Sequence, residues 1–296
     1  MILCFDIGGS RIKAASATGG TVTPLGDTPT PTADFAAFLA ALRSYRAPGH
    51  RAVSISIAGV VDPDSQRIRV ANIPCADHRA LAPEIEAALG LPTLILNDAD
   101  CFALAEARQG AGQGHRNVFG VILGTGVGGG LVIDGKLVSG PGGFAGEWGH
   151  GPVAKTQVEG VTLPEYPCGC GLTGCIDAVC SARGIEKLYR TLHGVEALAP
   201  AILTDWQAGE VRATKTVKVW TALIAPPLAM VLNTVGASIV PVGGGLSNVT
   251  ALVATLDTAV RGMILRQTDR PLVVPAQCRI EPGLIGAAEA GAAAFG

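Results

Sequence analysis

The sequence contains the same pattern twice: an apolar segment, a glycine-rich turn and a second apolar segment. The first turn is DIGGS at residues 6–10, and the second is GTGVGGG at residues 124–130. Short apolar segments that flank such turns favour paired β-strands. The repetition predicts two related α/β lobes around a nucleotide cleft.

Helical and strand periodicities fill the rest of each lobe. Helices are predicted at residues 35–45, 80–89, 99–110, 182–192, 217–235 and 284–295, and further strands at 52–57, 94–96 and 238–242. We predict a smaller N-terminal lobe from residues 1–117 plus 285–296. Residues 118–284 are predicted to form a larger C-terminal lobe.

Both glycine turns have the composition of phosphate-binding loops. Glycine permits positive φ and lets backbone N–H groups approach an anion. A carboxylate directly before such a loop would repel phosphate unless a cation lies between them, so Asp6 is a candidate outer ligand of Mg²⁺. The alternative for each turn is an ordinary glycine-rich hairpin. A third stretch, GGGLS at 243–247, follows an apolar strand and is a candidate contact to adenosine through Gly244 and Gly245.

Asn97 and Asp98 stand where an apolar strand ends and a helix begins. Asp98 could be an N-cap there. Strand ends in open α/β sheets also face the ligand crevice, where an aspartate can accept the proton of an attacking hydroxyl. Such a base is what phosphoryl transfer to an alcohol requires.

One histidine and three cysteines form a compact set: His150, Cys168, Cys170 and Cys175. One imidazole and three thiolates make a closed tetrahedral shell for zinc, so the metal is predicted to be structural. A redox or adventitious site is the alternative. Glu147 lies three residues before the histidine, and a metal-fixed loop would hold it as an acceptor for sugar hydroxyls.

Composition limits the other classes of function. Hydrophobic residues make up 48% and charged residues 16%, which indicates a large buried core. A net charge of −2 gives no excess of positive charge for binding nucleic acid or an anionic membrane. Five further cysteines are scattered through apolar segments, which favours free thiols and a cytoplasmic location. No signal peptide is evident, and prolines at 226 and 227 interrupt the longest apolar tract, so no membrane span is expected.

Six motifs together resemble the ROK family (repressors, open reading frames and kinases): DIGGSRIK, LNDADCFALAEA, LGTGVGGGLVIDGK, GEWGHGPV, CGCGLTGCID and VPVGGGLSN. The resemblance covers nearly the whole chain. It implies a two-lobed α/β fold of the actin/hexokinase (ribonuclease H-like) type with a structural zinc loop, and a homodimer that uses sugar and ATP.

The resemblance also implies roles for individual residues. Asp98 would be the catalytic base. Sugar contacts would come from Gly59, Asn72, Asn97, Glu147 and the zinc-bound His150. Phosphate-binding positions would be Gly8, Gly9, Ser10, Gly124, Thr125 and Gly126.

Two departures from the family pattern stand out. Ser10 and Arg11 replace a threonine and a lysine, which keeps a hydroxyl and a positive charge in the ATP loop. Asp177 replaces the glutamate that follows the last cysteine. One methylene less weakens the sugar contact implied for this position, or makes room for a bulkier substituent.

Within the family, the chain is most similar to bacterial N-acetylglucosamine kinases, on the long interval between His150 and Cys168 and on the NDADCFALAEA and SARGIEKLY segments. This similarity implies ATP-dependent phosphorylation of the 6-hydroxyl of N-acetylglucosamine. The alternatives are a glucokinase or fructokinase, an N-acetylmannosamine kinase, and a sugar-sensing regulator without catalysis.

Overall fold

The computed structural model describes residues 1–62, 64–140, 143–278 and 281–296. It divides into two compact units. Unit 1 consists of Met1–Gly110, Gly130–Ala145 and Cys278–Gly296. Unit 2 consists of Ala111–Gly129 and Gly146–Gln277.

Unit 1 is built on a five-stranded sheet in the order β3-β2-β1-β4-β7. Its strands are β1 (Ile2–Ile7), β2 (Arg11–Thr18), β3 (Thr21–Pro29), β4 (Ala52–Ile57) and β7 (Thr93–Asn97). β1, β2 and β3 form an antiparallel meander, while β4 and β7 run parallel to β1. The predicted hairpin around residues 6–10 is confirmed, and β4 has the predicted bounds.

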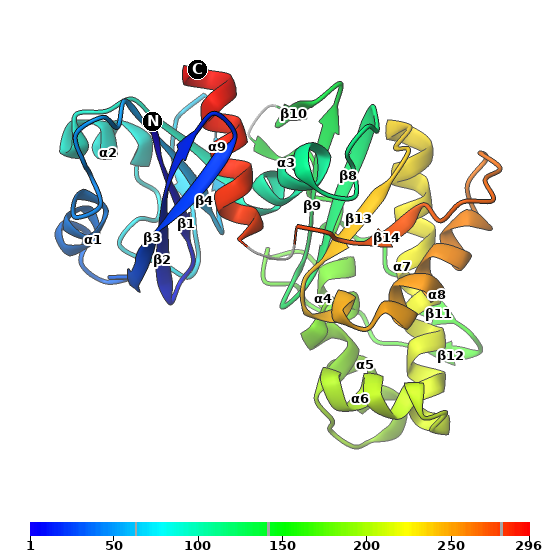
Figure 1. The fold of residues 1–296 in the computed structure, drawn as a ribbon. Coiled ribbons are helices and arrows are strands. Elements are labelled where there is room, and N and C mark those ends of the chain that lie inside the picture. The colour runs from blue at the N-terminus through cyan, green and yellow to red at the C-terminus, as the bar shows by residue number, and fades with distance from the viewer. Residues whose placement is uncertain (63, 141–142, 279–280) are drawn as a thin grey trace. The chain divides into compact units, whose positions relative to one another are not determined.

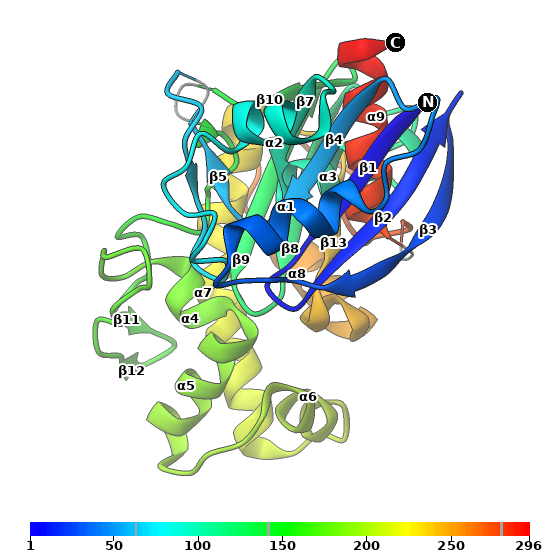
Figure 2. The same cartoon turned by 90° about the vertical axis from the view of Figure 1, so that its left-hand side faces the viewer.

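Helices cover both faces of this sheet (Figures 1 and 2). One face packs Phe5 and Ile55 against α1 (Phe35–Arg43) and α2 (Leu81–Leu89). The other face packs against α3 (Asp98–Gln109) and α9 (Pro282–Phe295), whose small side chains permit close approach. A Cβ on Gly291 of α9 would lie only 2.9 Å from the Cβ of Ser54 on β4. The short hairpin of β5 (Val60–Val61) and β6 (Ile68–Arg69) follows β4.

A second five-stranded sheet has the order β10-β9-β8-β13-β14. Its strands are β8 (Asn117–Leu123), β9 (Val127–Ile133), β10 (Lys136–Val138), β13 (Val240–Gly243) and β14 (Val273–Pro275). Asp134 and Gly135 join β9 to β10 with φ angles of 51° and 71°, the positive values that a tight two-residue hairpin turn requires.

The remaining elements belong to unit 2. They are the hairpin of β11 (Gln157–Val158) and β12 (Val161–Thr162), the helices α4 (Ile176–Cys180), α5 (Ala182–His193), α6 (Ala199–Gln207), α7 (Val211–Val235) and α8 (Thr250–Arg261), and the 3₁₀ turn η2 (Gly245–Asn248). The packing of α7 includes a hydrogen bond from Trp220 Nε1 to the carbonyl of Cys180 at 2.9 Å.

Helix α7 continues through Pro226 and Pro227, so the two prolines do not end the helix predicted at residues 217–235, and that prediction is confirmed. Proline cannot donate to the carbonyl four residues earlier, and burial of the helix compensates for the lost bonds. Among the described residues, α7 is the one helix long and apolar enough to span a membrane, and 56% of its most apolar window is buried in the protein. Such burial is typical of a core helix.

Candidate functional site

Polar side chains of unit 1 gather where its parallel strands end. Asp6 of β1 is in register with Ser56 of β4, and Asn97 of β7 is in register with Ile57 one residue further on. The Ser56 hydroxyl donates to Asp6 Oδ1 at 2.8 Å. Carboxyl ends of parallel strands are the usual ligand-binding edge of an α/β sheet.

Asn97 is the N-cap of α3, and Asp98 is the first residue of the helix. Asn97 Oδ1 accepts a hydrogen bond from the Ala99 N–H at 2.7 Å, and its Nδ2 donates to the carbonyl of Gly59 at 3.0 Å. The alternative that Asp98 is the N-cap is therefore wrong. The structure brings Gly59 and Asn97 together beside Asp98, whose Oδ1 also accepts from the Ala99 N–H at 2.9 Å.

The loop from Gly8 to Ser10 is closed by backbone bonds. The Gly8 N–H donates to the Arg11 carbonyl at 3.0 Å, and the Thr30 hydroxyl donates to the Gly8 carbonyl at 2.7 Å. A Cβ on Gly9 would lie 3.0 Å from the Cβ of Asn72, so Asn72 packs directly on the loop. The exposed Arg11 guanidinium pairs with Asp27 on β3.

Asp6 lies against the first turn of α9, where the sequence gives no sign of a functional residue. A Cβ on Gly283 would collide with both carboxylate oxygens of Asp6. Burial raises the pKa of Asp6, while the Ser56 hydroxyl and the Lys13 ammonium oppose this shift. Lys13 is held in turn by Glu281 at 2.9 Å. Gly283 thus provides the space that the Asp6 carboxylate occupies.

The second of the two glycine loops lies in unit 2. It is shorter than the predicted range of residues 124–130. Gly124 N–H donates to the Gly126 carbonyl at 2.9 Å, and β9 begins at Val127. Gly244, with φ of 87°, packs directly against Leu123 and the amide of Gly124. The structure thus brings the turn at Gly244 and Gly245 next to the loop of Gly124, Thr125 and Gly126.

The extra glycines of GTGVGGG lie inside β9 and permit close packing. A Cβ on Gly129 would lie 2.8 Å from Cδ1 of Trp148, and one on Gly130 would lie 2.7 Å from the carbonyl oxygen of Ala99. The expectation that residues 128–130 belong to a phosphate loop is therefore wrong.

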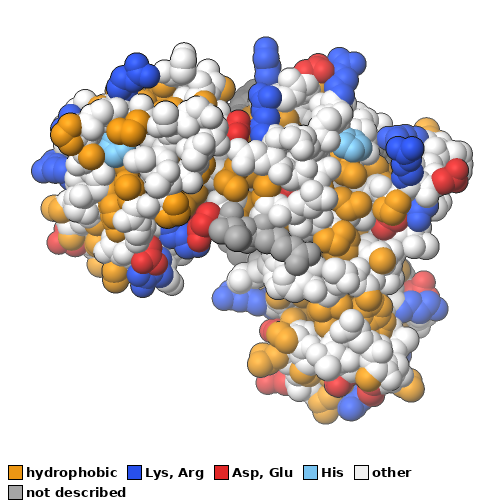
Figure 3. All heavy atoms as spheres, viewed as in Figure 1, with side chains coloured by type: hydrophobic (Ala, Val, Ile, Leu, Met, Phe, Trp, Pro, Cys, Tyr) orange, Lys and Arg blue, Asp and Glu red, His pale blue; other side chains and the backbone are white. Residues whose placement is uncertain are grey.

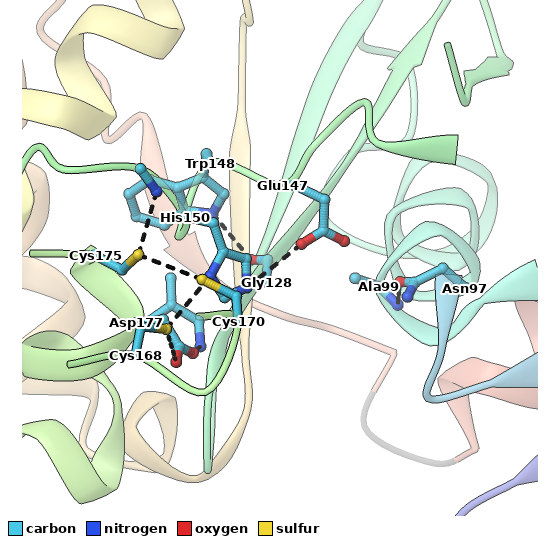
Figure 4. Close-up of polar contacts among 12 residues, drawn as sticks. Asn97, Ala99, Gly128, Glu147, Trp148, His150, Cys168, Cys170, Cys175 and Asp177 are labelled. Carbon is cyan, nitrogen blue, oxygen red and sulfur yellow. Dashed lines mark hydrogen bonds and ion pairs between the residues drawn. The ribbon is translucent and has the colours of Figure 1, made fainter. Parts of the chain in front are cut away.

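Trp148 is a residue that sequence reasoning missed. Its Nε1 donates to the Gly128 carbonyl at 3.0 Å, and its ring meets the ring of Phe119 edge to face at 6.3 Å between centroids. These contacts attach the loop that carries Glu147 and His150 to β9 (Figure 4). The sequence did contain an indication of its importance, because one of only three tryptophans in the chain lies between two candidate site residues.

The structure brings together His150, Cys168, Cys170 and Cys175, with one ligand atom from each within 4.8 Å of the others. Cys168 Sγ lies 3.6 Å from His150 Nδ1, and Cys170 Sγ lies 3.7 Å from Cys175 Sγ. A tetrahedral zinc ion, with Zn–S of about 2.3 Å and Zn–N of about 2.0 Å, spaces such pairs about 3.5 and 3.8 Å apart. The four side chains therefore fit one zinc ion.

Zinc binds cysteine as the thiolate, and burial raises the pKa of the Cys168 thiol to about 12. Cys168 would therefore lose its proton on binding the metal. The other ring nitrogen of His150, Nε2, lies 3.7 Å from a carboxylate oxygen of Glu147. At this distance the contact is electrostatic rather than a hydrogen bond, and a carboxylate beside a metal-bound histidine commonly helps to orient the ring. Burial raises the pKa of Glu147, and His150 opposes the shift.

Asp177 lies in the first turn of α4, two residues after Cys175, the last cysteine of the cluster. Its Oδ1 accepts from the Val127 N–H at 2.7 Å, and its Oδ2 lies 3.5 Å from Cys168 Sγ. Figure 4 shows its carboxylate among the cysteines.

Comparison with known proteins identifies the class of this fold and site. The model of the ROK family matches residues 2–291, and the chain belongs to this family. It is 37% identical over 239 residues to the N-acetyl-D-glucosamine kinase of Pasteurella multocida, covering 80% of this chain and 79% of the relative. It is 36% identical to the N-acetylgalactosamine kinase AgaK of Shewanella, covering 96% and 94%.

Among solved structures, a ROK family glucokinase from Streptomyces griseus in complex with glucose and AMPPNP is 27% identical to the chain. The TM-score is 0.73, and the match covers 98% of both chains. The prediction of a two-lobed α/β ROK fold is confirmed.

Proposed function

We propose that the protein transfers the γ-phosphate of ATP to the 6-hydroxyl of N-acetylglucosamine. The observation that carries this proposal is an acidic residue at the start of α3, beside the locked side chain of Asn97, in a chain whose curated relatives include N-acetyl-D-glucosamine kinases. The position of Asp98 supports our assignment of the base, and the relatives support an amino sugar as the acceptor.

In the proposed reaction, Asp98 takes the proton of the 6-hydroxyl as its oxygen attacks the γ-phosphorus. A bond forms between that oxygen and phosphorus, the bond from phosphorus to the β–γ bridging oxygen breaks, and ADP leaves. The Ala99 N–H bonds Asp98 Oδ1 and so fixes the carboxylate. We assign the substrate proton to this carboxylate.

We assign the sugar contacts to polar groups of Asn97, Gly59, Asn72, Glu147 and His150. Glu147 is a suitable acceptor because its carboxylate is half-buried beside His150 Nε2. A buried acceptor discriminates strongly between substrates with and without a matching hydroxyl.

ATP phosphates are assigned to two glycine loops. The first contains Gly8, Gly9, Ser10 and Arg11, and the second contains Gly124, Thr125 and Gly126, with Gly244 and Gly245 behind it toward adenosine. The complex of the Streptomyces griseus glucokinase with AMPPNP supports use of ATP in this family. Mg²⁺, when bound with ATP, neutralises the charge that develops on the phosphates. Asp6 would hold it through water.

We assign a structural zinc ion to His150, Cys168, Cys170 and Cys175. All four positions of a tetrahedral shell are then protein ligands, which leaves none for substrate. The metal would fix His150 and, through it, Glu147.

Charges of both signs are interspersed on the face in Figure 3, in keeping with small-molecule substrates rather than nucleic acid or membrane. A homodimer, a cytoplasmic location and the lobe boundaries at 117/118 and 284/285 remain predictions.

N-acetylgalactosamine is a second candidate substrate, because the Shewanella relative named for that activity matches 96% of this chain. The two sugars differ only in the configuration of one ring hydroxyl. A panel of N-acetylglucosamine, N-acetylgalactosamine, N-acetylmannosamine, glucose and fructose, each with ATP, tests the proposal. We expect the highest kcat/KM for N-acetylglucosamine. Preference for another sugar would replace the substrate alone, whereas no ADP formation with any sugar would overturn the kinase proposal.

A further inference from the structure

We propose that Asp177 is a positioning residue that connects the metal cluster to the phosphate loop of Gly124–Gly126, and not a ligand of the sugar. The inference rests on the proposed function, because that function assigns ATP phosphates to this loop. It concerns a position where the family pattern has a longer acid.

Both the side chain and the backbone of Asp177 make hydrogen bonds within unit 2. Its Oδ1 accepts from the Val127 N–H at 2.7 Å, directly after the loop. Its backbone N–H donates to the Gly149 carbonyl at 2.9 Å, next to His150. One residue therefore joins the loop to the segment that carries Glu147 and His150.

The loop is shaped to receive this carboxylate. A Cβ on Gly126 would lie 2.7 Å from Asp177 Oδ1, so the carboxylate occupies space that any larger residue at position 126 would fill. From the other side, the Ala182 N–H donates to the Gly124 carbonyl at 2.8 Å. The segment from α4 to the start of α5 thus holds both ends of the loop.

The second carboxylate oxygen faces the metal cluster. Asp177 Oδ2 lies 3.5 Å from Cys168 Sγ, one of the four proposed zinc ligands. A bound Zn²⁺ offsets the negative charge of its thiolates, which permits a carboxylate at this distance. One carboxylate oxygen therefore contacts the loop and the other faces the metal cluster. Both oxygens of the short aspartate side chain have protein neighbours.

Three variants separate a positioning role from a sugar contact. Asp177→Ala removes both contacts, Asp177→Asn keeps an acceptor for the Val127 N–H and can donate to Cys168 Sγ, and Asp177→Glu restores the family residue. Asp205→Ala, an exposed aspartate of α6, is the matched control. For each variant we would measure the KM for ATP and for N-acetylglucosamine, the zinc content, and hydrogen exchange of the peptide that contains the Val127 amide.

We expect Asp177→Ala to raise the KM for ATP by about tenfold or more, as for a lost hydrogen bond to a charged group. The KM for sugar should change less than twofold, and the Val127 amide should exchange faster. Asp177→Asn should restore both the ATP KM and the slow exchange. Asp205→Ala should match the wild type.

The inference is overturned if Asp177→Ala and Asp177→Asn both raise the sugar KM while the ATP KM and the exchange of Val127 stay unchanged. Should Asp177→Ala fail to fold, Asp177→Asn decides by itself, since a raised sugar KM in that variant contradicts the positioning role and an unchanged one supports it. The exchange measurement needs no activity, so failure of the kinase proposal would be seen separately.

Discussion

The indole Nε1 of Trp148 donates a hydrogen bond to the backbone carbonyl of Gly128 at 3.0 Å. This bond fixes the loop of residues 146–150 to β9, and we propose that His150 fixes the same loop to the zinc ion. Glu147 directly precedes Trp148 and lies three residues before His150.

Trp148→Phe tests the bond to Gly128, because it keeps an aromatic ring against Phe119 but removes the donor. The Gly128 carbonyl then loses its partner, which should lower the free energy of unfolding by about 1–2 kcal/mol. We expect a raised sugar KM with zinc content unchanged. Urea unfolding, kinetics and metal analysis check this, with Trp206→Phe on α6 as the control. A sugar KM equal to that of the wild type would show that the metal cluster holds Glu147 unaided.

Cys170→Ser tests the proposed zinc site. Purified wild-type protein should contain about one zinc ion per chain, and the variant should lose the metal and much of its activity. Cys75→Ser, whose thiol donates to the Pro31 carbonyl in unit 1, is the matched control and should keep both. Full zinc occupancy in Cys170→Ser would contradict the ligand assignment.

Asp98→Asn tests the proposed base. Because the N-cap is Asn97, the substitution leaves the cap intact, and an asparagine Oδ1 can still accept from the Ala99 N–H. Folding, ATP binding and sugar binding should be nearly unchanged, while kcat falls by about 10² to 10⁴. Turnover near the wild-type rate in a folded variant that binds sugar would contradict the role of Asp98 as the base.

The short-range parts of this molecule were predictable from sequence. Strand β4, the hairpin around residues 6–10 and the gathering of the four metal-ligand candidates follow from alternation, glycine placement and ligand spacing, all of which act over a few residues. Strand β3 was missed because it is largely exposed, contains Pro24 and Gly26, and pairs irregularly with β2 near Ala14. Such a strand has no alternating pattern to detect.

Long-range packing was not predictable in the same way. A glycine that leaves room for a phosphate and a glycine that leaves room for an indole ring look alike in sequence. For this reason the sequence placed Gly129 in a phosphate loop. The sequence around Gly283 did not show that glycine is required there. The requirement comes from the carboxylate of Asp6, which is far away in the sequence. Only the assembled fold shows these steric requirements.

His50 gives a prediction for pH. It is 7% exposed, its Nδ1 accepts from the Ala47 N–H at 3.1 Å, and its Nε2 lies 2.7 Å from the Ser16 hydroxyl. Burial, with smaller effects of the N-terminal amine and Arg46, lowers the pKa of His50. The neutral ring therefore stabilises the fold above the unfolded-state pKa of about 6.5, and this stability is lost as the pH falls through the folded-state pKa.

His50→Gln removes this titration. The difference in unfolding free energy between wild type and variant should shrink as the pH is lowered from 7.5 to 5, because only the wild type loses the contribution of a neutral imidazole. Urea unfolding at several pH values measures it. A difference that stays constant across this range would show that the His50 pKa is not lowered.

The placement of Gly283 against Asp6 has a consequence for biosynthesis. Asp6 leaves the ribosome long before the helix turn that lies against its carboxylate, because Gly283 lies 277 residues after Asp6. At about 5–20 residues per second, that interval is on the order of 15 to 60 s. Throughout it, the nascent sheet exposes the apolar face that α9 later covers. The growing chain therefore offers a binding surface to chaperones, and the surroundings of the Asp6 carboxylate are completed only after α9 has been translated.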